Sequence, residues 1–382
     1  MSVRFSLPAS GFVAAIVGFG GTLALIIAAA DAVGASPAQK TSWVAAMCLA
    51  MAVETLWLSG KLRMPIVTAS STPGAALIAA TTGFSMNEAA GAFVIAAVLL
   101  VATGLFRPLT RLIASIPTAV ASGMLAGILL GFALSAARAA PVDPVLILPL
   151  VVLFFVARLW SPSLSVLAVL VGGVALTFAL GRVEALPAPT PSALVFVPPD
   201  FSLAATVGLA LPLYLVTMAS QNLSGLAVLR AAGYTPPPGL LIGVTGFVSL
   251  VTAPFGGLTT NLAAISAAIC TNPDAHPDPA ERWKTAPFYA STYALFALFG
   301  ASLIALFAAL PASLIVLVAG LALLAPLANA LTIALKDEAD RAAAVTAFAV
   351  TASGITVLGV GAPFWGLAAG LGVFGLGKLR RG

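Results

Sequence analysis

The sequence predicts an all-α integral membrane protein of 14 transmembrane spans, arranged as 7+7 inverted repeats, with spans 3 and 10 broken by short extended segments that meet at the midplane. Two observations predict this fold class. The first is composition: 61% of the 382 residues are hydrophobic and 8% are charged, whereas about 25% of a soluble globular chain is charged. The second is a polar, Pro-containing segment that recurs after about half the chain length, which is typical of duplicated membrane folds.

Apolar runs separated by Gly, Pro or charged residues define the expected spans, since about 20 apolar residues cross a bilayer. In the first half they cover residues 11–31, 41–60, 65–83, 88–106, 117–137, 143–159 and 163–181. A Pro-rich connector over residues 183–200 follows. In the second half the spans cover residues 201–231, 239–253, 254–271, 285–309, 311–333, 340–360 and 362–377.

The charged residues are placed as expected for a multi-pass protein of a bacterial inner (plasma) membrane. The net charge is +5, but the basic residues punctuate apolar runs singly or in pairs, so we expect a lipid bilayer and no nucleic acid as partner. With the N-terminus in the cytoplasm, only Lys40, Arg138 and Arg182 of the 17 Lys and Arg residues lie outside. This agrees with the positive-inside rule and predicts that both termini are cytoplasmic.

The recurring segment covers residues 65–80 and again residues 254–269. Aligned without a gap, the copies match two polar triplets, which are Ser70, Ser71 and Thr72 in the first and Thr259, Thr260 and Asn261 in the second. Small and β-branched residues after Pro65 predict extended backbone, and Ser71 or Thr72 before Pro73 is typical of a helix N-terminus. Each segment is therefore expected to change from strand to helix inside the membrane.

These two predicted helix N-termini form a candidate anion site. Extended backbone at membrane depth must be buried or paired, because unsatisfied N–H and C=O groups are costly in hydrocarbon, so we expect the two extended halves to pair. The N–H groups at Ser71–Gly74 and Thr260–Ala263, at the positive ends of the helix dipoles, then point into one cavity. The triplet residues and Gly74 are candidate ligands, and plain helix capping is the alternative.

A second polar cluster, Thr217 to Asn222, lies in the long span that begins at Phe201. Gln221 and Asn222 are candidate hydrogen-bonding groups for a substrate, and hydrogen bonding between helices is the alternative. The sequence has no carboxylate between Asp200 and Asp274, which favours an anionic or neutral substrate over a cation.

Glu54 lies well within a predicted span, which makes it a candidate proton carrier. Lys61 lies about two helical turns further along the chain, so a structural partnership is the alternative. We expect no catalytic residue, cofactor or metal, because Cys48 and Cys270 lie in apolar runs and His276 lacks neighbours at ligand spacing.

Four aromatic residues are candidates to line an apolar pocket for a ring: Phe12, Phe19, Tyr214 and Phe255. Phe19 is favoured because glycines on both sides of it let the first span approach its neighbours closely. Ordinary packing or lipid contact is the alternative for each of them.

Several short motifs are distributed along most of the chain. They are Ser-Thr-Pro-Gly-Ala-Ala-Leu at 71–77, Leu-Val-Thr-Met-Ala-Ser-Gln-Asn at 215–222, Ala-Ala-Gly-Tyr at 231–234, Ala-Ala-Ile-Ser-Ala-Ala-Ile-Cys at 263–270 and Pro-Phe-Trp-Gly-Leu at 363–367. The sequence with these motifs resembles the BenE family of benzoate/proton symporters. Glu54 lies outside the motifs, so the resemblance lends it no support.

The resemblance implies a fold shared with nucleobase and sulfate transporters. It implies a core domain of residues 1–106 (spans 1–4) and 201–309 (spans 8–11), and a gate domain of residues 107–182 (spans 5–7) and 310–382 (spans 12–14), joined by the connector 183–200. The nucleobase branch carries Glu where Gln221 stands here, which counts against a nucleobase substrate. A homodimer is the oligomer considered.

We therefore expect a secondary active transporter that takes up benzoate or a related aromatic carboxylate with protons by alternating access. One alternative is a transporter or channel for another small anion or a neutral, nucleobase-like substrate. Another is a membrane-embedded enzyme acting on lipid or isoprenoid. Such an enzyme would need convergent acids, His or a metal motif at membrane depth, and the chain offers only Glu54 there.

Overall fold

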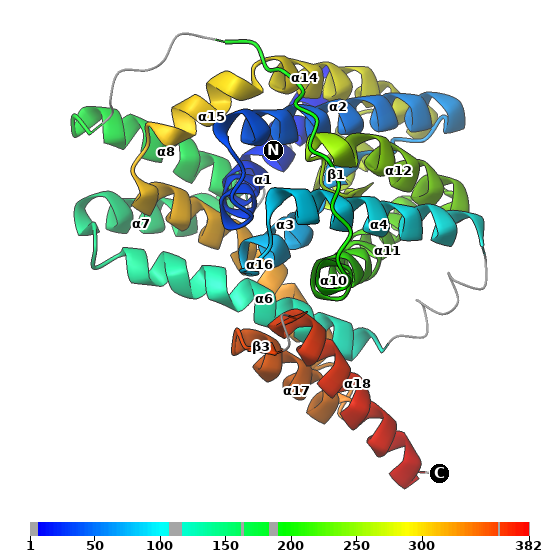
Figure 1. Cartoon of the computed structure of the whole chain (residues 1–382). Helices are drawn as coiled ribbons and strands as arrows, with labels where there is room; N and C mark the ends of the chain where they lie inside the picture. Colours follow the sequence, from blue (N-terminus) through cyan, green and yellow to red (C-terminus); the bar gives the residue numbers. More distant parts are fainter. Residues whose placement is uncertain (1–6, 107–116, 162–163, 183–189, 358–359, 382) are drawn as a thin grey trace.

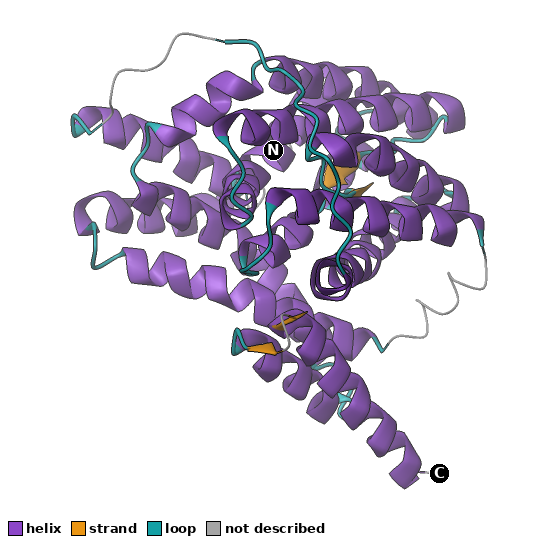
Figure 2. Cartoon of the chain, in the orientation of Figure 1, coloured by secondary structure: helices purple, strands orange, loops and turns teal. Residues whose placement is uncertain are grey.

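The computed structural model describes residues 7–106, 117–161, 164–182, 190–357 and 360–381, and these are mostly helical (Figure 2). Within this part of the chain, 8 helices are long and apolar enough to cross a membrane, or up to 9 if one bent pair is a single span. The long helices are α1 (Leu7–Ala32), α2 (Pro37–Leu62), α4 (Met86–Leu105), α6 (Thr118–Ala139), the helix Leu203–Ala231, the helix Pro238–Phe255, α16 (Ala312–Ala334) and α18 (Ala362–Arg381). The protein is therefore a multi-pass membrane protein.

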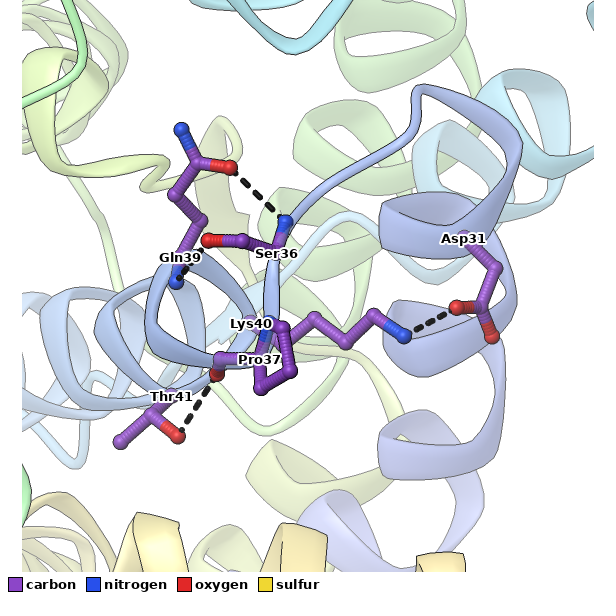
Figure 3. Close-up of polar contacts among 6 residues, drawn as sticks. All are labelled: Asp31, Ser36, Pro37, Gln39, Lys40 and Thr41. Atoms are coloured by element: carbon purple, nitrogen blue, oxygen red, sulfur yellow. Dashed lines mark hydrogen bonds and ion pairs between the residues drawn. The ribbon is translucent and has the colours of Figure 1, made fainter.

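The turn between α1 and α2 shows how the sequence sets these boundaries (Figure 3). Ser36 caps α2 in a capping box: its Oγ accepts from the N–H of Gln39 at 3.3 Å, and Gln39 Oε1 accepts from the N–H of Ser36 at 2.8 Å. Pro37 occupies the first turn of α2, where its missing N–H costs nothing. Asp31, near the end of α1, pairs with Lys40 across the turn.

Three shorter apolar helices, α7 (Pro144–Trp160), α8 (Ser165–Ala179) and α17 (Arg341–Ala352), lie where spans were predicted. The predicted span 340–360 is wrong in its second half, because α17 ends at Ala352 and Gly354 turns the chain with φ +68°. Beyond it, strand β3 (Thr356–Val357) pairs antiparallel with strand β4 (Val360–Gly361).

The predicted span 285–309 is not one straight helix. The chain enters it through the 3-10 turn η4 (Pro279–Thr285) and continues as α14 (Ala286–Leu298) and α15 (Gly300–Ala308), which are bent by 63° at the break. The connector before α9 is extended from residue 190 onward and crosses one face of the helices (Figure 1). Its backbone bonds to that face, for example from Asp200 N to Asn87 O at 2.9 Å.

Two segments change from strand to helix, as predicted. Strand β1 (Thr68–Ser70) precedes α3 (Thr72–Ala79), and strand β2 (Thr260–Leu262) precedes α13 (Ile265–Thr271). The strands pair antiparallel, with Thr68 opposite Leu262 and Ser70 opposite Thr260. The extended halves therefore satisfy each other's backbone groups, which confirms the expected pairing.

The ungapped alignment of the two copies was wrong by a few residues. It made Thr260–Ala263 a helix N-terminus, but Thr260 and Asn261 lie in β2 and α13 begins only at Ile265. Pro254 belongs to a 3-10 turn, η3 (Ala253–Phe255), that ends the preceding helix α12 (Pro238–Thr252). Strand pairing decides the register here, and an alignment by residue type could not detect the extra turn.

The helices pack in two sets. In one, α2 packs against α12 and α14, α4 against α12, and α1 against α3, α13 and α14. In the other, α6 packs against α16, α17 and α18, and α7 against α8. The sets meet where α1 contacts α8 and α16 and where α3 contacts α6 (Figure 1).

Candidate functional site

The paired strands lie at the centre of a polar network, because a two-stranded ribbon leaves backbone groups at both edges that must be satisfied when buried. At the β1 edge, Thr68 N donates to Thr55 Oγ1 at 3.0 Å, and the Thr68 carbonyl accepts from Tyr289 Oη at 2.7 Å. At the β2 edge, Thr260 N donates to Ser249 Oγ at 2.9 Å and Leu262 N donates to Asn222 Oδ1 at 3.0 Å. Side chains from α2, α12, α14 and the long helix therefore hold the ribbon.

Ser71 caps α3, as predicted. Its Oγ accepts from Gly74 N at 3.1 Å and from Thr217 Oγ1 at 3.3 Å, and Thr217 Oγ1 also lies 3.0 Å from Thr259 Oγ1. Ser71 N donates to the Thr259 carbonyl at 3.1 Å, which extends the pairing of the strands. Thr72, the first residue of α3, places its Oγ1 3.3 Å from Thr22 Oγ1 of α1.

Gly74 and Asn261, the remaining candidates of the two recurring segments, lie in α3 and β2. A Cβ at Gly74 would lie 2.6 Å from Leu213 Cδ1, so any larger residue there would require the Leu213 side chain to shift. Asn261 is fully buried in β2, opposite Ala69. With its amide oriented to satisfy its neighbours, its oxygen accepts from Ser71 N at 3.0 Å.

The long helix Leu203–Ala231 contains two π turns between its α segments: α9 (Leu203–Ala205), η1 (Thr206–Ala210), α10 (Leu211–Val216), η2 (Thr217–Asn222) and α11 (Leu223–Ala231). The η2 turn coincides with the predicted polar cluster and packs against β2, α3 and α6. π turns are rare in helices and are frequent at functional sites. Asn222 is fully buried and bonds to β2, whereas Gln221 is half-buried and its side chain has no hydrogen bond to a described residue.

A small cavity lies between α1, α2, β1 and α14. It is lined by Gly18, Phe19, Thr22, Met47, Met51, Ala69, Ser70 and Tyr293. Its volume is about 10 Å³, close to the space of one water molecule. Ser70 is only 3% exposed, and its Oγ has no hydrogen-bond partner among the described residues.

The walls of this cavity are aromatic as well as polar. Phe19 stacks on Phe296 with ring centroids 4.3 Å apart, and its edge faces Tyr293 at 6.2 Å. Gly18 makes this arrangement possible, because a Cβ there would lie 2.9 Å from Ser266 Oγ and 3.1 Å from Tyr293 Oη. The structure thus places Phe19 and Ser70, from different candidate groups, at one cavity.

The other aromatic candidates lie elsewhere. Tyr214 is buried, but its hydroxyl bonds to Thr103 on α4. Phe12 is 41% exposed and contacts Phe288, and Phe255 packs against Phe196 of the connector. None of these three lines the cavity.

Glu54 is 1% exposed and contacts β2 directly, since its Oε1 accepts from Thr260 Oγ1 at 2.6 Å. Its Oε2 has no hydrogen-bond partner among the described residues. Lys61 lies over the ring of Trp57, 4.5 Å from the centroid, so the alternative of a Glu54–Lys61 partnership is not what the structure shows.

Sequence reasoning missed the hydroxyl groups that hold the ribbon. Thr55 and Ser59 recur at a spacing of four on α2, and Thr245 and Ser249 do so on α12; all four are buried. Ser59 Oγ, for example, donates to the Ile66 carbonyl at 2.7 Å. Hydroxyl pairs at i and i+4 on otherwise apolar spans were the available signal, since they share one helix face.

Known proteins resemble this chain over most of its length. A family model, BenE, described as "Benzoate membrane transport protein", matches residues 3–376. The "Inner membrane protein YdcO" of Escherichia coli (strain K12) is 42% identical over 372 residues, covering 96% of this chain and 95% of that protein. The "Benzoate membrane transport protein" of Acinetobacter baylyi (strain ATCC 33305 / BD413 / ADP1) is 34% identical over 364 residues, covering 95% and 92%.

Solved structures show the same fold at low sequence identity. The overall structure of SLC26A9 superposes with a TM-score of 0.67 at 12% identity, covering 97% of this chain and 65% of that chain. The transmembrane domain of the cyanobacterial bicarbonate transporter BicA superposes with a TM-score of 0.59 at 14% identity, covering 97% and 98%. The family match and the curated relatives, which are named as membrane proteins or membrane transport proteins and not as enzymes, agree with the motifs in the sequence. The chain belongs to the BenE family of benzoate membrane transport proteins.

Proposed function

We propose that this protein takes up benzoate or a related aromatic carboxylate together with a proton, by alternating access. The observation that carries the proposal is the cavity beside β1, which combines hydroxyl groups of Thr22 and Ser70 with the aromatic rings of Phe19 and Tyr293. This matches a ligand with one polar end and one flat apolar end. The name of the Acinetobacter baylyi relative supports the choice of benzoate.

The carboxylate would be bound at the start of α3. Ser70 Oγ is a buried hydroxyl without a partner among the described residues, so it can donate to an anion at no cost to other bonds. The α3 dipole adds a positive potential there. Thr72 and Thr22 carry further hydroxyls beside it, and Gln221 is the amide available on the η2 turn. The ring would pack on Phe19.

The site must widen to admit this ligand. An apolar cavity of about 150 Å³ holds a benzene ring, whereas the cavity here measures about 10 Å³. We propose that the widening accompanies movement of a core domain (1–106 and 201–309) against a gate domain (107–182 and 310–382). The contacts of α1 with α8 and α16 and of α3 with α6 are the surfaces that would slide.

We place the chain in a bacterial inner membrane with cytoplasmic termini, as an inverted repeat of 14 spans. The name of the Escherichia coli relative, which is an inner membrane protein, supports this location. The two broken segments, the three short apolar helices and the bent helix pair occupy the positions of the remaining predicted spans. A homodimer is the assembly we propose to test by mass measurement in detergent.

Coupling to one proton would make transport electroneutral, because benzoate is an anion at neutral pH. Proteoliposomes with an inward proton gradient should therefore accumulate labelled benzoate, and a protonophore should abolish the accumulation. Equal accumulation without a gradient rejects coupling. Conductance far above carrier turnover in planar bilayers indicates a channel, and competition by uracil or sulfate in place of benzoate indicates another substrate.

Ser70→Ala tests the binding site. Losing a hydrogen bond to a charged ligand costs about 1.5–3 kcal/mol, so the KM for benzoate should rise by about tenfold or more. Stability should not fall, because Ser70 Oγ has no protein partner to lose among the described residues. Ser10→Ala is the matched control: Ser10 Oγ is also buried and unpartnered within that part of the chain, and it lies outside the cavity. Unchanged uptake in Ser70→Ala would reject the site.

A further inference from the structure

The polar network at β2 contains an acid that the binding site described above does not use. Glu54 is buried at membrane depth on α2, and one of its oxygens bonds to Thr260 while the other has no partner in the described part of the chain. Resting on the proposed symport, we propose that Glu54 is the group that carries the coupled proton, and that Thr260 links its protonation state to the anion site.

The network around Thr260 can accommodate both protonation states without moving heavy atoms. Thr260 Oγ1 lies 2.6 Å from Glu54 Oε1, 3.0 Å from Ser249 Oγ and 3.2 Å from the Thr245 carbonyl. When Glu54 is ionised, the Thr260 hydroxyl donates to Oε1. When Oε1 is protonated, Glu54 donates to Thr260 Oγ1, and the Thr260 hydrogen turns to the Thr245 carbonyl. Each hydrogen has an acceptor in each state.

The proton site and the anion site are neighbours through the strand pair. Thr260 lies directly opposite Ser70, which is one of the residues that line the cavity. Met47 and Met51 line the same cavity from α2, the helix that carries Glu54. Ser70 and Thr260 thus both face α2 from the ribbon, so an ionised Glu54 lies beside the position proposed for the carboxylate.

The elements that pack against α2 carry further titratable and charged groups, most of which have a hydrogen-bond, ion-pair or ring partner. On α14, which packs against α2, Tyr289 donates to the Thr68 carbonyl and Tyr293 lines the cavity. At η4, Lys284 pairs with Glu281, and Arg282 is bound by backbone carbonyls, including that of Thr271 at 2.8 Å. Across the α1–α2 turn, Asp31 pairs with Lys40, and at the far end of α2 Lys61 and Arg63 lie over Trp57 and Trp283.

The remaining elements against α2 carry no charged side chain. These are β1, β2, α12, α15 and η3. Among the described residues of α2 and of the elements packed against it, Glu54 is therefore the acid that bonds to the strand pair. Among the same residues, no Lys, Arg or His forms an ion pair with it.

These positions define the order of events. One proton from the external solution binds Glu54, which removes a negative charge from the neighbourhood of Ser70; one benzoate anion then binds, and both are released inside. Two like unit charges about 10 Å apart at an effective dielectric constant of about 20 repel by about 1.7 kcal/mol, and a repulsion of this size between an ionised Glu54 and the anion would weaken binding by roughly tenfold. Benzoate affinity should therefore fall by about this factor as Glu54 loses its proton with rising pH.

The test uses Glu54→Gln, which keeps a carbonyl oxygen for Thr260 and removes the proton. Proteoliposomes with this variant should lose at least about 90% of gradient-driven benzoate accumulation but retain counterflow of labelled against unlabelled benzoate, which needs no net proton movement. The benzoate Kd of the purified variant should be constant over the pH range in which the wild-type Kd rises. Glu338→Gln, at an exposed glutamate, is the matched control and should behave as wild type.

Gradient-driven accumulation in Glu54→Gln at the wild-type level would overturn the proposal, as would a wild-type pH dependence of Kd. If Glu54→Gln fails to fold, Thr260→Val, which removes the hydroxyl at nearly the same volume, should reduce the pH dependence of Kd, and an unchanged dependence would overturn the proposal. Failure of the symport itself is distinguished by the wild type, which would then show no gradient-driven accumulation at all.

Discussion

The neighbouring side-chain amides of Gln221 and Asn222 on the η2 turn are expected to have different roles, one in substrate binding and one in stability. Asn222 Oδ1 accepts the N–H of Leu262, a residue that is 1% exposed, whereas Gln221 is half-buried and its side chain makes no hydrogen bond to a described residue. Asn222→Leu keeps the side-chain size but leaves that N–H without an acceptor. A buried unsatisfied donor costs about 1–3 kcal/mol, which corresponds to a fall in Tm of about 1–4 °C for a chain of this length.

Gln221→Leu should affect transport and leave the stability unchanged. This change breaks no side-chain hydrogen bond to a described residue, so the Tm should stay within about 0.5 °C of wild type. If the Gln221 amide contacts the substrate, the KM for benzoate should rise by about tenfold. Thermal unfolding in detergent and uptake in proteoliposomes measure the two effects on the same preparations. An unchanged Tm in Asn222→Leu would refute the account of β2 anchoring, and an unchanged KM in Gln221→Leu would remove Gln221 from the site.

Three further predictions concern stability. Ser71→Ala removes the cap of α3 and should cost about 1 kcal/mol in thermal unfolding, and an unchanged Tm would contradict the cap. Gly123→Ala would place a Cβ 2.3 Å from the Ala344 carbonyl and should cost about 1–3 kcal/mol by separating α6 from α17, whereas Gly131→Ala on the same helix meets nothing within 4 Å and should be neutral or slightly stabilising. The hydrogen bond from Arg182 lowers the pKa of Asp143, in the turn before α7, so its stabilisation is present above the unfolded pKa of about 3.9 and is lost as the pH falls below it. Asp143→Asn should remove this part of the Tm decrease between about pH 5 and 3, and an unchanged decrease would show that the pair contributes nothing.

Much of the candidate site followed from local chemistry in the sequence. Pro65 and the small, β-branched residues after it predict extended backbone, and Ser71 before Pro73 predicts a capped helix, so both the break and the cap were predictable. Glu54 stood out because an ionisable group inside an apolar span is costly. These inferences depend on a residue and its near neighbours along the chain.

The errors arose where distant segments meet. The second copy was misplaced by a few residues because strand register depends on which backbone groups face each other across the pair, and similar residue types do not reveal this. Tyr214, a candidate to line a pocket, bonds to Thr103 on α4 and does not line the cavity, and the sequence alone does not show which neighbour a side chain on a buried helix meets. The 63° bend between α14 and α15 also lies within a stretch that was predicted as one span.

By itself the sequence determined a multi-pass helical membrane protein with two segments that change from strand to helix, since composition and local propensity act along a single segment. Only the tertiary structure decided that Thr260 bonds to Glu54, that Asn222 accepts a hydrogen bond from the β2 backbone, and that Phe19 and Ser70 line the same cavity. Those contacts join residues from different segments of the chain. They form because buried polar groups must find partners wherever packing brings them together.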